Sequence, residues 1–160
     1  MTRLARMVLL AAVVAAAYPL VSSAAESTDS LVGSWQLNLS KSTFDPGPGP
    51  KGQMRIYSHA GDTEKLTARG IGADGKPTLV QYSARYDGKD YPITGSSGGD
   101  LIALKRIDEL TTESTQKRGG KPVIVATRTV SPDGKTLTVI TKGTAPSGEK
   151  LNHRMVFEKH

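Results

Sequence analysis

The sequence offers few residues in arrangements that support catalysis or metal binding. It contains no cysteine and three histidines, His59, His153 and His160, none at the spacing of a metal-binding motif. The glycine-rich segment Gly95–Asp100 lacks the Lys-Ser/Thr ending of a phosphate-binding loop, and no helix is predicted after it. We therefore expect no enzyme, cofactor or metal site. A metal or haem held between His59 and His153 is the minor alternative.

Tyrosines and arginines are the better candidates for binding a small molecule. Tyr57, Tyr82 and Tyr86 are predicted wall residues of an internal cavity. Arginines recur near the middle of predicted strands, at Arg69, Arg85, Arg106 and Arg128. An arginine that points into an apolar interior needs a negative partner, so it would anchor an anion. The alternative for each is a solvent-facing side chain. The predicted ligand-binding set is Tyr57, Tyr82, Tyr86, Arg85, Arg106 and Arg128.

The elements that must position these residues are all β-strands. Valine, isoleucine, threonine and tyrosine recur in short segments, and no segment after residue 25 has a helical apolar stripe. The predicted strands are Val32–Leu39, Gln53–His59, Glu64–Gly70, Thr78–Tyr86, Asp90–Thr94, Asp100–Ile107, Leu110–Lys117, Val123–Val130, Thr136–Lys142 and Lys150–Glu158.

The turns between these segments predict how the strands connect. Asp74-Gly75, Asp87-Gly88, Asp133-Gly134 and Gly119-Gly120 are each followed by lysine. Such pairs suit type I′ hairpin turns, in which both central residues have positive φ. Consecutive hairpins predict an all-β antiparallel up-and-down meander. Closure removes its exposed edges, so we expect a barrel of about eight to ten strands. A bent half-barrel or a two-sheet sandwich is the alternative.

The N-terminal residues follow the pattern of an export signal. Arg3 and Arg6 precede an apolar stretch, Met7–Leu20, and small residues stand before a cleavage site between Ala25 and Glu26. We therefore expect a signal peptide at 1–25 and a periplasmic or secreted protein with no membrane span after cleavage. Cleavage after Ala24 and an uncleaved membrane anchor are the alternatives.

Composition predicts one monomeric domain at 26–160 that holds together without disulfides. The net charge is +6, and it falls to +4 once Arg3 and Arg6 are removed with the signal. The basic residues are scattered, and the densest cluster, Lys117–Lys121, coincides with a predicted hairpin tip. Because a nucleic-acid-binding surface needs a basic patch on one face, we expect no nucleic-acid partner.

The motif Gly33-Ser34-Trp35-Gln36-Leu37, followed by Ser40 and Phe44, resembles the first strand of the calycin superfamily, which includes the lipocalins and fatty-acid-binding proteins. The stretches Asn38–Pro50 and Ser131–Thr138 are similar to small exported bacterial proteins of unknown role that are described as lipocalin-like. The resemblance implies that Trp35 closes one end of the barrel. It also implies that a basic side chain of the last strand, Arg154 or secondly Lys159, packs on the indole as a structural plug.

Two departures from the fatty-acid-binding pattern stand out. A Pro/Gly stretch, Asp45–Gly52, occupies the position of their two lid helices, and the last strand has Arg154 without the tyrosine of their Arg-x-Tyr pair. We expect a module that binds or carries an apolar or amphipathic small molecule. The alternative is a periplasmic protein-interaction module, such as a hydrolase inhibitor, acting through Asp45–Gly52 and Gly95–Gly99. An open lumen would favour the first function, and a filled one the second.

Overall fold

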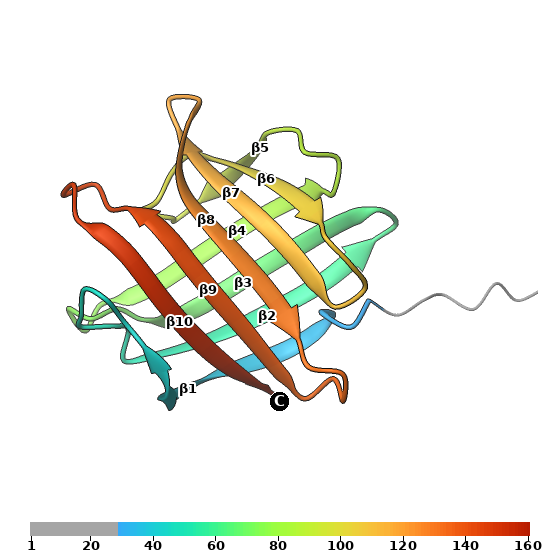
Figure 1. The fold of residues 1–160 in the computed structure, drawn as a ribbon, viewed down its shortest axis with the longest axis horizontal. Helices are drawn as coiled ribbons and strands as arrows, with labels where there is room; N and C mark the ends of the chain where they lie inside the picture. Colours follow the sequence, from blue (N-terminus) through green and yellow to red (C-terminus); the bar gives the residue numbers. More distant parts are fainter. Residues whose placement is uncertain (1–28) are drawn as a thin grey trace, which may run out of the picture.

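The structure, a computed structural model, describes residues 29–160 and is entirely β (Figure 1). The predicted signal peptide, 1–25, lies outside the described residues. Within residues 29–160, no helix is long and apolar enough to cross a membrane.

Ten antiparallel strands form a closed barrel in which each strand pairs with its neighbours in sequence. The ring closes where β1 pairs with β10, with Gln36 opposite Glu158. The strands are β1 (Gly33–Thr43), β2 (Gly52–Ala60), β3 (Thr63–Ile71), β4 (Pro77–Arg85), β5 (Tyr91–Thr94), β6 (Leu101–Arg106), β7 (Thr111–Arg118), β8 (Lys121–Val130), β9 (Thr136–Thr144) and β10 (Lys150–Lys159). The predicted all-β meander is therefore confirmed, and each predicted strand coincides with an observed one.

The two ends of the barrel carry different connections. At the end that we call the base, the chain enters through residues 29–32, and the β2–β3, β4–β5, β6–β7 and β8–β9 turns lie there. At the opposite end, which we call the mouth, residues 44–51 join β1 to β2 and residues 95–100 join β5 to β6. We call these two connections the Pro/Gly loop and the Gly/Ser loop.

The Asp-Gly turns differ from the predicted type. Gly75, Gly88 and Gly134 have positive φ, but within the described part of the chain no residue other than glycine does. The aspartates therefore keep negative φ, and the turns are not type I′. Each aspartate instead accepts a hydrogen bond from the backbone N–H two residues later, as at Asp133 and Lys135 (3.1 Å). Only the Gly119-Gly120 tip has positive φ at both residues.

Alternating side chains fill the base of the barrel. Trp35, Leu104, Leu137 and Phe157 are fully buried there. Leu31 joins the same core, and its carbonyl accepts a hydrogen bond from the Trp35 indole (2.8 Å). The entering segment is thereby fixed across the base, and a separate cavity lies on the mouth side of this core.

Candidate functional site

The lumen holds a cavity of about 250 Å³ that extends from the mouth toward the centre of the barrel. Its walls are mainly apolar and include Leu66, Ile102 and Val139. Tyr57, Tyr82 and Arg128 line it at the deep end, and Ser96, Gly98 and His153 line it at the mouth. The cavity thus combines apolar walls with a polar floor.

The floor is built on a buried ion pair. Glu64 on β3 is fully buried, and Arg128 on β8 is only 3% exposed. Arg128 Nη1 donates to Glu64 Oε1 (2.7 Å) and contacts the Tyr82 hydroxyl (2.8 Å). Tyr82 donates to the same carboxylate oxygen (2.5 Å), and Tyr86 donates to the other one. Both carboxylate oxygens therefore have partners.

The surroundings keep this pair ionised. Burial raises the pKa of Glu64, but the positive charge of Arg128 and the hydrogen bonds from Tyr82 and Tyr86 outweigh it, and the net pKa lies below the ordinary 4.5. Burial lowers the pKa of Arg128, but its interactions with Tyr82 and Glu64 outweigh this and hold the pKa well above the ordinary value for arginine. Burial also raises the pKa of Tyr82, so this tyrosine remains a hydrogen-bond donor at neutral pH.

Arg128 has donor capacity that the protein does not use. Its Nε and Nη2 atoms are buried and have no hydrogen-bond partner among residues 29–160. The hydroxyl of Thr112, which stands opposite Arg128 on β7, is also buried without a partner. Buried polar groups are almost always satisfied in native proteins, and leaving one unpaired costs about 1–3 kcal/mol. The floor of the lumen therefore contains two guanidinium donors and a hydroxyl that are unsatisfied within residues 29–160.

A second guanidinium, that of Arg55 on β2, lines the same cavity. It donates to Gln53 Oε1 (2.8 Å) and lies over the Phe157 ring at 4.7 Å. The charged side chains that line the cavity are thus two arginines, and Glu64 behind the floor supplies one compensating carboxylate. The lumen carries one excess positive charge.

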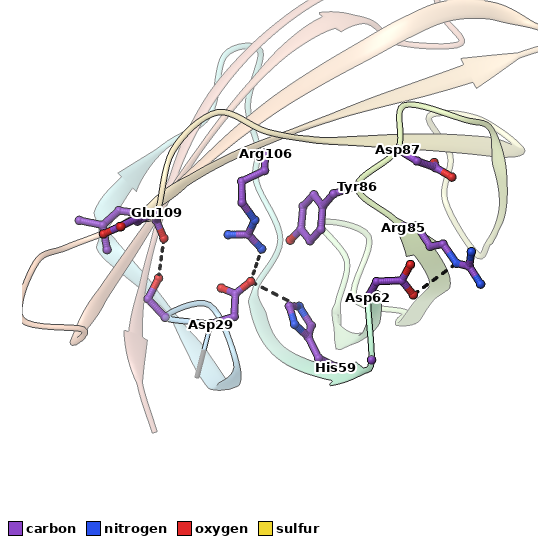
Figure 2. Close-up of a pocket in the computed structure, with 11 residues that line it drawn as sticks. Asp29, His59, Asp62, Arg85, Tyr86, Asp87, Arg106 and Glu109 are labelled. Atoms are coloured by element: carbon purple, nitrogen blue, oxygen red, sulfur yellow. Dashed lines mark hydrogen bonds and ion pairs between the residues drawn. The ribbon is translucent and has the colours of Figure 1, made fainter. Parts of the chain in front are cut away.

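A larger hollow of about 770 Å³ lies at the base (Figure 2). Tyr86 and His59 point into it between two ion pairs, one joining Arg106 to Asp29 and one joining Arg85 to Asp62 (3.4 Å). His59 Nε2 lies 3.5 Å from Asp29, and Arg106 stacks on the Tyr86 ring at 4.3 Å. Both arginines have carboxylate partners, so this hollow lacks the excess positive charge that Arg55 brings to the lumen.

The structure divides the predicted ligand-binding residues between these two sites. Tyr57, Tyr82 and Arg128 line the lumen. Tyr86 lines the base hollow and reaches the lumen floor only through Glu64. Arg85 and Arg106 also line the base hollow, so the structure does not bring them together with Arg128. Both stand near the base ends of their strands, where the side chains emerge beyond the core.

The predicted plug has a different partner from the one expected first. Trp35 is fully buried, and the ammonium of Lys159 lies over its ring at 5.0 Å. Arg154 does not contact Trp35. It is on the outer face of β10 and donates to the carbonyl of Lys41 (3.1 Å). Residues 155, 157 and 159 share the inward face of that strand, and 154 has the opposite parity.

Sequence reasoning missed Glu64. The signal was present, because Glu64, Leu66 and Ala68 alternate on one face of β3 and all three are buried. The same alternation places Arg128 inside with Ile124, Ala126 and Val130. A carboxylate and a guanidinium on inward faces predict a buried pair once the barrel closes.

The Gly/Ser loop matches the letters Gly-x-Ser-x-Gly around Ser97. It connects strand β5 to strand β6, whereas a nucleophile elbow connects a strand to a helix. Ser96 donates to Gln116 (2.6 Å), and the carbonyl of Ser97 accepts from Arg118 (2.6 Å). The loop is thus held to β7 at the lumen mouth.

The chain resembles known proteins in its structure and not in its sequence. No protein-family model matches the chain, and no curated protein matches it. The chain is similar in structure to the zebrafish ileal bile acid-binding protein, solved in complex with cholic acid. The TM-score is 0.48 and the sequence identity 10%, and the match covers 81% of this chain and 98% of the zebrafish chain.

Proposed function

We propose that this protein binds a small amphipathic molecule in its lumen, with the polar head of the molecule on Arg128. One observation carries the proposal: the Arg128 guanidinium is 3% exposed, lines the cavity, and has unpartnered Nε and Nη2 atoms. A carboxylate or another planar acceptor matches the geometry of a guanidinium edge. Glu64 and Tyr82 hold the opposite edge in place, so the free edge is pre-organised.

Charge and size narrow the ligand class. Glu64 balances Arg128, and Arg55 adds a second positive charge to the cavity lining, so the lumen favours a head group with one negative charge. The cavity of about 250 Å³ has room for about eight waters and is below the usual ~300–1,000 Å³ of ligand pockets. We therefore propose a compact ligand, such as a short-chain or aromatic carboxylate, with its apolar part against Leu66, Ile102 and Val139.

The first experiment is native mass spectrometry of the protein purified from its own host. A retained small molecule of defined mass supports the proposal. Isothermal titration with benzoate, hexanoate and dodecanoate then tests the class. We expect the two compact acids to bind and dodecanoate to bind more weakly, because its chain is too long for the cavity. Absence of a retained mass, together with no binding of any of the three acids, would contradict the proposal.

A pair of variants tests the role of Arg128. The double variant Glu64→Leu with Arg128→Met removes both buried charges, so neither is left unpaired. We expect it to lose at least tenfold in affinity for benzoate, since one charge-assisted pair contributes about 1.5–3 kcal/mol. Arg85→Met is the matched control at the base, and its affinity should equal that of the wild type.

We also propose that the chain is exported and acts by binding and not by catalysis. The support is the N-terminal signal pattern with small residues before Glu26. N-terminal sequencing of the mature protein from the host's periplasm or culture medium would test this. A mature chain that begins at Ala25 or Glu26 supports export, and a cytoplasmic chain that begins at Met1 contradicts it.

A further inference from the structure

His153 on β10 holds the Pro/Gly loop at the mouth of the lumen. Its Nδ1 atom accepts a hydrogen bond from the backbone N–H of Asp45 (3.1 Å). The neighbouring N–H of Asn152 donates to the carbonyl of Asp45 (2.7 Å), and the Phe44 ring lies 5.6 Å from the imidazole, centroid to centroid. Two successive residues of β10 therefore hold one residue of the loop, and the imidazole also lines the ligand cavity.

The hydrogen bond at Nδ1 exists in only one protonation state. A neutral imidazole with its proton on Nε2 can accept at Nδ1, whereas the protonated ring presents an N–H at both nitrogens. After protonation, the N–H at Nδ1 of His153 would face the backbone N–H of Asp45, and two donors cannot form a hydrogen bond. We propose that His153 is a pH-sensitive latch, which holds the Pro/Gly loop over the lumen mouth at neutral pH and releases it in mild acid.

The groups around His153 support this direction. Burial lowers the pKa of His153, and the nearby negative charge of Asp45 opposes this only in part. Arg55 and Arg128, from β2 and β8, line the same cavity and add positive charge. The residue opposite on β9 is Thr141, and Ser96, Ser97 and Gln116 line the cavity from the Gly/Ser loop and β7. These four residues carry no charge. Because an imidazole freed into solvent has an ordinary pKa of about 6.5, acid favours the released state.

The consequence for the lumen rests on the proposed function. His153 lines the cavity, so release of the Pro/Gly loop should loosen this side of the mouth, and a bound ligand should dissociate faster. The Gly/Ser loop provides an internal comparison at the same mouth. Gln116 and Arg118 hold it by hydrogen bonds, and no histidine takes part in either of these contacts.

Amide hydrogen exchange of the ligand-free protein tests the latch directly. Protection factors, corrected for intrinsic exchange, are measured for the Asp45 amide and the rest of the Pro/Gly loop between pH 8 and pH 5. We expect the Asp45 amide to lose at least tenfold in protection over this range. The Gly/Ser loop and the core strands should keep theirs.

Two variants separate the latch from simple destabilisation. In His153→Asn, the side-chain oxygen can accept in place of Nδ1 but does not titrate, so protection should stay high at both pH values. In His153→Phe, the ring packing is retained without an acceptor, so protection should be low at both. Gln116→Leu is the matched control, since it should loosen the Gly/Ser loop equally at pH 8 and pH 5.

Equal protection of Asp45 at pH 8 and pH 5 in the wild type would overturn the latch. So would a pH dependence that persists in His153→Asn. Neither result depends on a ligand, so failure of the latch is distinguishable from failure of the proposed binding function. Stopped-flow release of benzoate at the two pH values then tests the consequence. Release at least tenfold faster at pH 5, in the wild type but not in His153→Asn, is expected.

Discussion

Glu64 and Arg128 form an ion pair across the full width of the barrel. They lie on β3 and β8, five strands apart in the ten-stranded ring, and their charged atoms are 2.7 Å apart. Tyr82 and Arg128 face the lumen, and Tyr86 faces the base hollow. The pair therefore divides the interior into two compartments and fixes the depth of the ligand cavity.

Breaking this pair on one side should strongly destabilise the fold. Glu64→Gln leaves the Arg128 charge buried with no counter-ion, which should cost about 3–5 kcal/mol in the free energy of unfolding. The double variant Glu64→Leu with Arg128→Met should recover most of that loss. Urea denaturation measures both. A cost below about 1 kcal/mol for Glu64→Gln would be inconsistent with a buried ionised pair.

Stability should fall in acid because of Glu64. Its pKa is lower in the folded protein than the ordinary 4.5, so the folded state binds the proton less readily than the unfolded state. The stabilisation is fully present above about pH 5 and is lost as the pH falls from 4.5 through the folded pKa. Between pH 7 and pH 3, the double variant should lose less stability than the wild type. If the free energy of unfolding fell by the same amount in both proteins, Glu64 would not be the cause of the acid sensitivity.

The base plug can be tested by three substitutions. Trp35→Ala should cost about 3–5 kcal/mol, the usual range for removing a fully buried aromatic side chain. Lys159→Ala should cost no more than about 1 kcal/mol, as expected for an exposed cation on an aromatic face. Arg154→Ala should change stability less than Lys159→Ala, because the Arg154 side chain lies outside the barrel. Thermal or urea unfolding measures the stability of the three variants. If Arg154→Ala cost more stability than Lys159→Ala, Arg154 and not Lys159 would be the partner of Trp35.

A larger side chain in the lumen should weaken ligand binding without lowering the stability of the fold. Ala68 faces the cavity, so Ala68→Phe should occupy the ligand space and weaken benzoate binding at least tenfold. Its effect on unfolding should be small, because the new ring enters existing space. Ala84 is fully buried but does not line the cavity, so Ala84→Phe should cost about 1–3 kcal/mol by overpacking. Unchanged benzoate affinity in Ala68→Phe would place the ligand outside the lumen.

The fold was predictable because its signals are local. Strand segments, hairpin glycines and the absence of helical periodicity are all read within a few residues. The site was less predictable because it depends on how the faces of distant strands combine. Parity along each strand separates inward Arg128 and Lys159 from outward Arg154. It does not show that β3 and β8 lie opposite each other, nor that Arg106 reaches Asp29 at the base. Those relationships follow from closure of the ring.

Closure of the ring also affects how fast the protein can fold. The contacts between β1 and β10 join residues as distant as Trp35 and Lys159, which are 159 − 35 = 124 positions apart. The entropy of bringing such segments together must be overcome before their pairing gives any stabilisation. Refolding should therefore be slow compared with a helical bundle of equal length. Until the seam forms, both terminal strands present free edges that can pair with other molecules, so refolding yield should decline as protein concentration rises.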